Sequence, residues 1–147
     1  MIKTLVVGVS ARHAHLNRVH MDILFGEGSE LSPKKNIGQP GQYASNEQIT
    51  IITSAGTMKL RIIGPLRAQT QIELSLTDAR KLGINPPIRN SGDIDDSVGA
   101  KVVGPCGEIE LQNGIIIAAR HIHLCKKTAE EYCLRDGDVV SIKTEGK

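Results

Sequence analysis

The chain has 147 residues, of which 39% are hydrophobic and 2% aromatic, and its 18 basic and 16 acidic residues give a formal net charge of +2. A chain of this length forms one compact unit with room for at most two small lobes. The balanced charge and the scarcity of aromatic side chains argue against nucleic-acid binding, which relies on cationic surfaces and base stacking. No apolar run approaches the roughly 20 residues of a membrane-spanning helix, so we expect no membrane partner.

Three cysteines, Cys106, Cys125 and Cys133, cannot all pair with one another, and none belongs to a Cys-x-x-Cys motif. We therefore expect reduced thiols in a cytoplasmic protein. Because unpaired cysteines usually behave as small hydrophobes, we expect each of them to be buried.

The first third of the chain is predicted to hold a strand, a helix and a loop. Residues 4–10 are β-branched and apolar, as in a strand. Asn17 can cap a helix whose apolar stripe ends at Gly26. Residues 26–45 are rich in Gly, Pro, Ser and Lys, and this composition predicts a loop.

The middle of the chain is predicted to hold three strands. Two of them, at 47–53 and 58–63, flank a turn at Ala55-Gly56. Residues 69–76 alternate between polar and apolar side chains, which predicts a half-buried strand with Glu73 on its polar face.

The last part is predicted to hold two short helices and several strands. One helix runs from a Thr77 cap to Gly83, and the other covers residues 126–133 with a poor cap, because a thiol, that of Cys125, precedes it. Asn113-Gly114 is typical of a β-hairpin turn. The remaining strands are expected at 102–103, 108–111, 115–119 and 139–143.

Many short strands separated by frequent turns favour a mainly β fold, either a barrel or a sandwich. A unit of strand, Arg-His-x-His-Leu, short helix and glycine occurs twice in the chain. This repetition predicts two related lobes, approximately residues 1–90 and 91–147, with segments that can be exchanged between them.

The repeated pentapeptide, at residues 12–16 and 120–124, is the strongest chemical signal in the chain. Side chains two apart on a strand point the same way, so each copy can aim two imidazoles at one cation such as zinc. The four histidines are His13, His15, His121 and His123. Either the two pairs share one metal, or each binds its own with a third ligand; plain hydrogen-bonded strand histidines are the alternative. The fifth histidine, His20, is expected on a helix surface.

Three other residues are candidates for the same site. Glu73 adds a carboxylate if the polar face of its strand lines a cavity, and is otherwise a solvated side chain. Arg67 follows a Gly-Pro turn and can present a guanidinium to phosphate. Ser91 lies in a polar Ser-Gly-Asp turn that can bind a ligand. Three further arginines compete with Arg67 for this role: Arg12, Arg89 and Arg120.

Taken together, these motifs resemble the phosphate propanoyltransferase family, the phosphotransacylases of the propanediol-utilisation type. The resemblance covers nearly the whole chain. Its most specific segments are Val9-Ser10-Ala11-Arg12-His13-Ala14-His15-Leu16, Gly64-Pro65-Leu66-Arg67-Ala68-Gln69-Thr70-Gln71-Ile72-Glu73, Arg89-Asn90-Ser91-Gly92-Asp93, and Gly114-Ile115-Ile116-Ile117-Ala118 running on to Arg120-His121-Ile122-His123.

The resemblance implies a fold of two small β-barrels with short helices, and two zinc ions per chain. It assigns His13, His15 and Glu73 to one metal and His121 and His123 to the other. In the family a further histidine, beyond the last residue of this sequence, completes the second metal. We therefore expect a second barrel that is incomplete at its C-terminal end and a second metal without its third histidine.

The resemblance also implies the reaction of propanoyl-CoA or acetyl-CoA with phosphate to give acyl phosphate and CoA, so these substrates are the expected partners. It assigns Arg67 to phosphate binding and places Ser91 in the substrate-binding loop, and we expect both residues to take part in catalysis. We expect direct, metal-assisted attack of phosphate on the thioester. No amphipathic leader precedes the first strand, so a free cytoplasmic enzyme is expected instead of one packed into a bacterial microcompartment. The oligomeric state is open, with a homodimer as one option.

Two other functions fit the same residues. A metal-dependent thioester hydrolase would use the same ligands to activate water, although no general base can be placed beside the metal. An inactive, shortened paralogue would bind only CoA or a metal. Phosphate-dependent release of CoA separates the first from the proposed transferase, and metal content separates the second.

Overall fold

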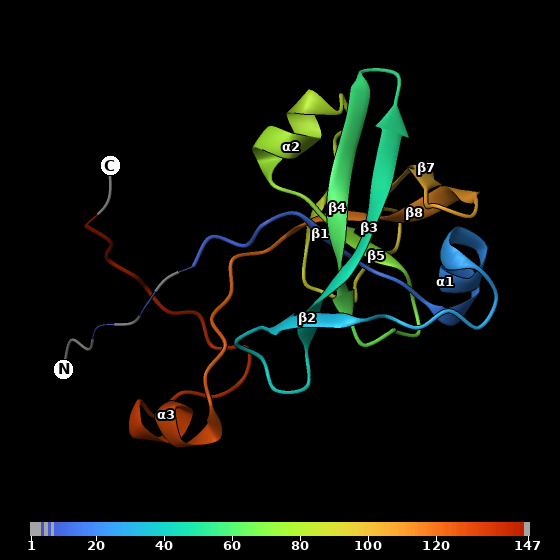
Figure 1. Ribbon diagram of the computed structural model, residues 1–147. Coiled ribbons are helices and arrows are strands. Elements are labelled where there is room, and N and C mark those ends of the chain that lie inside the picture. Colours follow the sequence, from blue (N-terminus) through green and yellow to red (C-terminus); the bar gives the residue numbers. More distant parts are fainter. Residues whose placement is uncertain (1–3, 5, 7, 146–147) are drawn as a thin grey trace.

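The computed structural model describes residues 4, 6 and 8–145 (Figure 1). Six strands close into a barrel, because each pairs with the next and the last pairs with the first. Around the ring, the order is β3, β4, β1, β5, β8, β7 and back to β3. Their bounds are β1 His13–His15, β3 Tyr43–Thr53, β4 Gly56–Gly64, β5 Gln71–Glu73, β7 Val98–Val103 and β8 Glu108–Ala118.

Two more strands extend the barrel wall: β2, Pro33–Asn36, pairs with β3, and β6, Ile88–Arg89, pairs with β8. The helices are short, at Arg18–Phe25 (α1), Leu76–Lys81 (α2) and Lys126–Glu131 (α3). The prediction of a mainly β fold with short helices is therefore confirmed. None of the helices in the described ranges has the length and apolar character needed to cross a membrane.

Aliphatic side chains fill the barrel, as the scarcity of aromatic residues predicts. Burial of each large aliphatic side chain contributes about 1.5–3 kcal/mol to folding, so this cluster dominates the stability of the fold. Its fully buried large members come from the barrel strands and the residues beside them, from α1 and from the end of α2: Leu16, Met21, Leu24, Ile49, Ile51, Leu60, Ile62, Ile72, Leu82, Val102 and Ile115.

The predicted helix starts are largely correct. Asn17 caps α1, and its side-chain oxygen accepts a hydrogen bond of 2.8 Å from the backbone N–H of His20. Gly26 ends the helix with a positive φ of 104°. For α2, however, the cap is Ser75 and not Thr77, because the Ser75 hydroxyl accepts from the N–H of Asp78. The poor cap expected at Cys125 is also found, since its side chain makes no capping hydrogen bond.

Three predictions in the first half need correction. The described residues among 4–10 form no strand, and Val6 and Val9 are fully exposed, because no neighbouring strand lies beside them. The segment 26–45 is not all loop, since it contains β2 and the start of β3. The predicted strand at 69–76 is shorter, covering only β5.

The hairpin predicted at Asn113-Gly114 is wrong, because both residues lie inside β8. This strand pairs antiparallel with β7 in its first part and parallel with β5 and β6 in its second part. Gly114 lies between Leu111 and Ile115, where the register with β7 is irregular. Its φ is 118°, and a Cβ at this position would lie only 2.9 Å from the carbonyl oxygen of Thr70. The Asn-Gly signal therefore marks a bend within a strand and not a turn between two strands.

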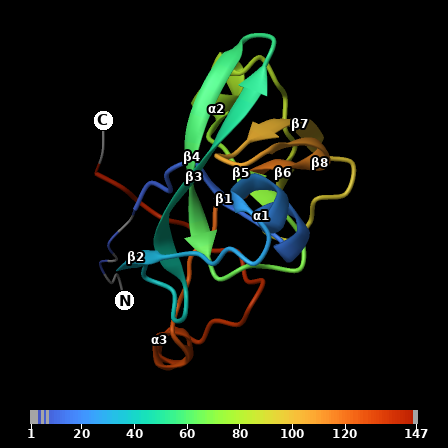
Figure 2. The ribbon, with the colours of Figure 1, turned by 45° about the vertical axis from the view of Figure 1, so that its right-hand side comes forward.

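After Ala118, α3 is the one regular element among the described residues, and Figures 1 and 2 both show it apart from the barrel. The strand predicted at 139–143 is absent, and Val139 is 98% exposed. All three cysteines are exposed and unpaired by disulfides, so the prediction of buried thiols is wrong. Strands β7 and β8 close a barrel begun before residue 90, and the division into lobes 1–90 and 91–147 stays a prediction.

The close approach of β7 to β8 at Gly99 predicts that a larger side chain there destabilises the fold. A Cβ at this position would lie 1.8 Å from the backbone oxygen of Leu111, so the Gly99→Ala substitution must push the two strands apart. We expect the free energy of unfolding to fall by about 1–3 kcal/mol or more in urea denaturation. Gly38→Ala is the control, because nothing lies within 4 Å of its added Cβ. Equal stability of the two variants would contradict the close strand packing.

Candidate metal centre

The pairing of β1 with β5 builds the candidate site. The two strands run antiparallel, with His13 opposite Glu73 and His15 opposite Gln71. Directly opposed side chains lie on the same face of a sheet, and residues two apart share that face. The four polar side chains therefore gather on one side, while the residue between the histidines, Ala14, is fully buried in the core with its partner on β5.

Three of these side chains form a group suited to a metal ion. The candidate ligand atoms of His13, His15 and Glu73 all lie within 4.8 Å of one another. His13 Nε2 lies 2.7 Å from Glu73 Oε2. The other ring nitrogen of His13, Nδ1, donates to the carbonyl oxygen of Ala11 at 2.8 Å, which fixes the ring with Nε2 toward the carboxylate.

Burial and neighbouring charges set the pKa values of the group. Burial lowers the pKa of His13, but hydrogen bonds to the Glu73 carboxylate and the Ala11 carbonyl outweigh it, and the net pKa is raised. Burial and the positive charge of Arg67 lower the pKa of His15 to about 4. Burial raises the pKa of Glu73, but the hydrogen bond from His13 and its charge lower this pKa by more, so the net pKa is lowered. Near neutral pH the group therefore holds an ionised carboxylate and a neutral His15.

The donor set fits zinc. Two imidazoles and one carboxylate are ligands that zinc accepts at about 2.0–2.2 Å, and three protein ligands leave one position open. His15 is 3% exposed, and among the described residues its Nδ1 is a buried polar atom without a hydrogen-bond partner. A buried nitrogen without a partner is costly. A cation bound by His13, His15 and Glu73 would coordinate the donor atoms of this group.

Polar side chains extend from this group toward the predicted phosphate-binding residues. Arg67 Nη1 donates to Ser91 Oγ at 3.2 Å, so the structure brings these two candidates together. Gln71 links them to the metal group, since its Nε2 lies 2.9 Å from Glu73 Oε1 and 3.0 Å from Ser91 Oγ. Sequence reasoning missed Gln71, although its place on the polar face of the strand predicted at 69–76 was a usable signal.

Two of the competing arginines are engaged elsewhere. Arg12 pairs with Asp78 on α2 at 3.2 Å, and Arg89 pairs with Asp93 at 3.4 Å. The Arg67 guanidinium instead contacts a neutral hydroxyl, and its charge contributes to lowering the pKa values of His15 and Glu73. Arg67 is thus the arginine best placed for a charged ligand beside the metal group.

The second histidine pair has the same local geometry but a different setting. His121 Nδ1 donates to the carbonyl oxygen of Ala119, as His13 does to that of Ala11, and the His121 and His123 rings are T-shaped at 4.7 Å. Both side chains are exposed. Within the described residues they belong to no group of three ligands, and they do not join the first one. Their role as ligands of a second metal stays a prediction.

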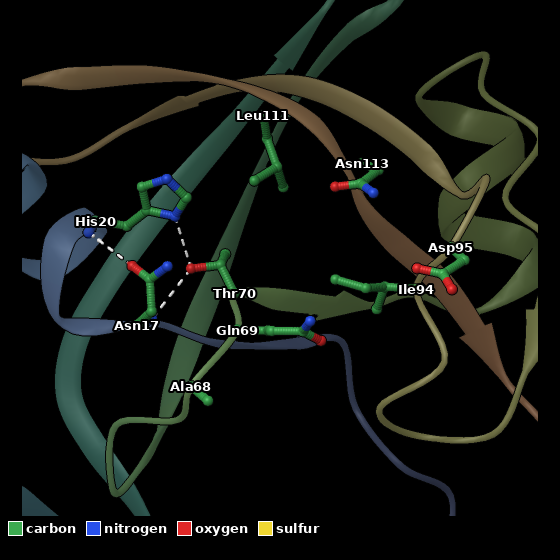
Figure 3. A pocket seen from close by; sticks show the side chains of 9 residues that line it. All are labelled: Asn17, His20, Ala68, Gln69, Thr70, Ile94, Asp95, Leu111 and Asn113. Atoms are coloured by element: carbon green, nitrogen blue, oxygen red, sulfur yellow. Dashed lines mark hydrogen bonds between the residues drawn. The ribbon is translucent and has the colours of Figure 1, made fainter.

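A separate polar pocket lies beside the start of β5 (Figure 3). Its volume is about 240 Å³, and none of the three candidate metal ligands lines it. His20, predicted on the helix surface, is half-buried here, with Nδ1 2.7 Å from Thr70 Oγ1, and burial lowers its pKa. The Asn17 N–H also donates to Thr70 Oγ1, so this network ties the start of α1 to the segment before β5.

Comparison with known proteins matches the chain to one family. A family model described as phosphate propanoyltransferase matches residues 6–147. The chain is 47% identical over 142 residues to a phosphate propanoyltransferase of Thermotoga maritima, covering 96% of this chain and 68% of that protein. A relative of the same name from Rhodopseudomonas palustris is also 47% identical over 142 residues, covering 96% and 63%.

A third phosphate propanoyltransferase, from Rhodobacter capsulatus, is 46% identical over 141 residues, covering 95% of this chain and 66% of that protein. The chain therefore spans about two thirds of the length of these relatives. These matches confirm the family resemblance predicted from the motifs, and with it the relationship to phosphotransacylase enzymes.

The hydrogen bond between His13 and Glu73 predicts the effect of Glu73→Gln on the zinc-free chain. The substitution removes the carboxylate that raises the pKa of His13, so burial dominates and this pKa should fall below its wild-type value. Titration of the histidine ring protons by NMR measures this shift. His20 is the internal control, because its pKa is lowered by burial beside Thr70. An unchanged His13 titration would contradict the pairing.

Proposed function

Because the chain belongs to the phosphate propanoyltransferase family, we propose that it transfers an acyl group, propanoyl or acetyl, between CoA and phosphate. The observation that carries this proposal is the junction of two sets of side chains. The metal-ligand group His13, His15 and Glu73 is joined through hydrogen bonds to the Arg67–Ser91 pair. A cation site next to an anion site is what the reaction of a thioester with phosphate requires.

We assign zinc to His13, His15 and Glu73, and a second zinc to His121 and His123. A zinc ion bound to the first group would act as a Lewis acid for the oxygen and sulfur atoms on which negative charge develops. The residues themselves supply what the metal needs: His13 and His15 offer ring nitrogens, and the Glu73 carboxylate offsets one positive charge. His15 is already neutral near pH 7, whereas His13 must give up the proton it shares with Glu73.

Arg67 and Ser91 hold the phosphate in this scheme. The guanidinium binds phosphate oxygens in a bidentate way and offsets their charge. A phosphate oxygen then forms a bond to the carbonyl carbon of the thioester while the carbon–sulfur bond breaks, and CoA leaves as a thiolate that later takes a proton. Holding the two substrates in line can account for roughly 7–11 kcal/mol of the barrier.

The transfer is direct, without a covalent acyl-enzyme. Ser91 Oγ accepts hydrogen bonds from Arg67 and Gln71, both of which are donors, so neither of them can remove its proton. A serine without such a base is a weak nucleophile. Phosphate, which is already anionic near neutral pH, needs no such activation.

Zinc removal and restoration test the proposed reaction. Treatment with a chelator should abolish phosphate-dependent release of CoA from acetyl-CoA or propanoyl-CoA, and added zinc should restore it. His13→Ala and Glu73→Ala should lower the metal content and reduce turnover to background, because each removes one ligand. His20→Ala is a matched control outside the ligand group. Release of CoA without phosphate would instead indicate a thioester hydrolase, and full activity in the absence of metal would contradict the metal centre.

Arg67→Ala tests phosphate binding. The variant should keep its metal but show a KM for phosphate raised about 10-fold or more, since a charge-assisted contact contributes about 1.5–3 kcal/mol. Arg67→Lys should be intermediate, because an ammonium keeps the charge and loses the bidentate geometry. Arg80→Ala, on the exposed face of α2, is the control. Unchanged phosphate kinetics in Arg67→Ala would remove Arg67 from this role.

A further inference from the structure

Gln71 is an uncharged polar side chain that is only 2% exposed, although it belongs to a strand of three residues. It lies on β5 opposite His15 and on the same face as Glu73. A buried amide must satisfy its hydrogen-bonding groups within the protein. The partners of Gln71 therefore show what this position requires.

The orientation of the amide follows from its partners. The backbone N–H of Gly92 can only donate, and it lies 2.7 Å from the side-chain oxygen Oε1 of Gln71. The opposite end of the amide must then be the NH₂ group, which has two hydrogens. One is donated to Glu73 Oε1 at 2.9 Å and the other to Ser91 Oγ at 3.0 Å.

This arrangement has a consequence for the metal ligand Glu73. Its two carboxylate oxygens are held by different partners, Oε1 by Gln71 and Oε2 by His13. The carboxylate cannot rotate without breaking one of these bonds. Oε2 is therefore the oxygen presented to the position between the candidate ligands.

A second consequence concerns Ser91. Its hydroxyl oxygen accepts from Gln71 and from Arg67, which uses both of its acceptor positions. The hydroxyl hydrogen is then left to donate outward. Beside the Arg67 guanidinium, a donating hydroxyl suits an anion such as phosphate.

We infer that Gln71 is a positioning residue that couples the two halves of the site. It fixes Glu73 for the metal and, through the same NH₂ group, fixes Ser91 as a donor for phosphate. The inference rests on the proposed function, because zinc and phosphate are the ligands that it assigns to these residues. Its distinctive feature is that loss of one neutral side chain weakens the binding of two different ligands, zinc and phosphate.

Gln71→Met tests this coupling, because methionine has a similar length and volume and forms none of the three hydrogen bonds. Gln69→Met is the matched control, since Gln69 is exposed two residues earlier. Zinc affinity is measured by competition with a chromophoric chelator without substrates. Phosphate affinity is measured calorimetrically on the zinc-free chain. Thermal unfolding of both variants reports on folding.

We expect Gln71→Met to weaken zinc binding about 10- to 100-fold, as is usual for loss of a group that orients a metal ligand, and phosphate binding about 10-fold. Gln69→Met should match the wild type in both. Wild-type affinities in a folded Gln71→Met would overturn the inference, because a purely structural role changes only the unfolding temperature. Loss of zinc affinity alone would overturn the coupling to Ser91.

If Gln71→Met fails to fold, an experiment on the wild-type protein still tests the inference. Both side-chain amide protons of Gln71 should exchange slowly in ¹⁵N NMR and shift on separate additions of zinc and phosphate, unlike those of Gln69. Rapid exchange, or no shift with either ligand, would overturn the inference. A wild-type chain that binds both ligands without releasing CoA would contradict the proposed function alone. The zinc and phosphate affinities of Gln71→Met could still be compared with those of the wild type.

Discussion

The register between β1 and β5 is the constraint on which the site depends. His13 faces Glu73 and His15 faces Gln71, so four polar side chains share one side of a two-strand pair while Ala14 and Ile72 pack into the core on the other. A slip of one residue in β5 would send Gln71 and Glu73 to the face opposite the two histidines. Burial of the aliphatic residues therefore enforces the arrangement of the polar ones, and the same packing that stabilises the barrel builds the site.

Electrostatic interactions among these side chains favour the binding of a cation. His13 and Glu73 form a hydrogen-bonded pair at 2.7 Å, which raises the pKa of His13 and lowers that of Glu73. His15 is neutral at physiological pH, because burial and the charge of Arg67 lower its pKa to about 4. Metal binding then has to displace a proton from His13 only. The positive charge of Arg67 beside the group favours an anionic second ligand.

Much of this could be predicted from the sequence because it is local. Spacing of two in Arg-His-x-His-Leu places paired imidazoles on one face, and Asn17 and Gly26 mark the ends of α1 correctly. Non-local features could not be predicted: nothing in residues 113–114 shows that β8 continues through them with an irregular register against β7 and does not turn. The role of Gln71 depends on the loop holding Ser91, 20 residues away along the chain. Exposure of the second histidine pair likewise depends on where the chain runs after the barrel has closed.

Anomalous diffraction at the zinc absorption edge, from crystals of the zinc-loaded protein, tests the metal centre most directly. We expect a peak bounded by His13 Nε2, a ring nitrogen of His15 and Glu73 Oε2, with the direct hydrogen bond between His13 and Glu73 replaced by coordination. Zinc bound only at other positions, with His13 and Glu73 still hydrogen-bonded to each other, would contradict a metal centre built by the β1–β5 pair.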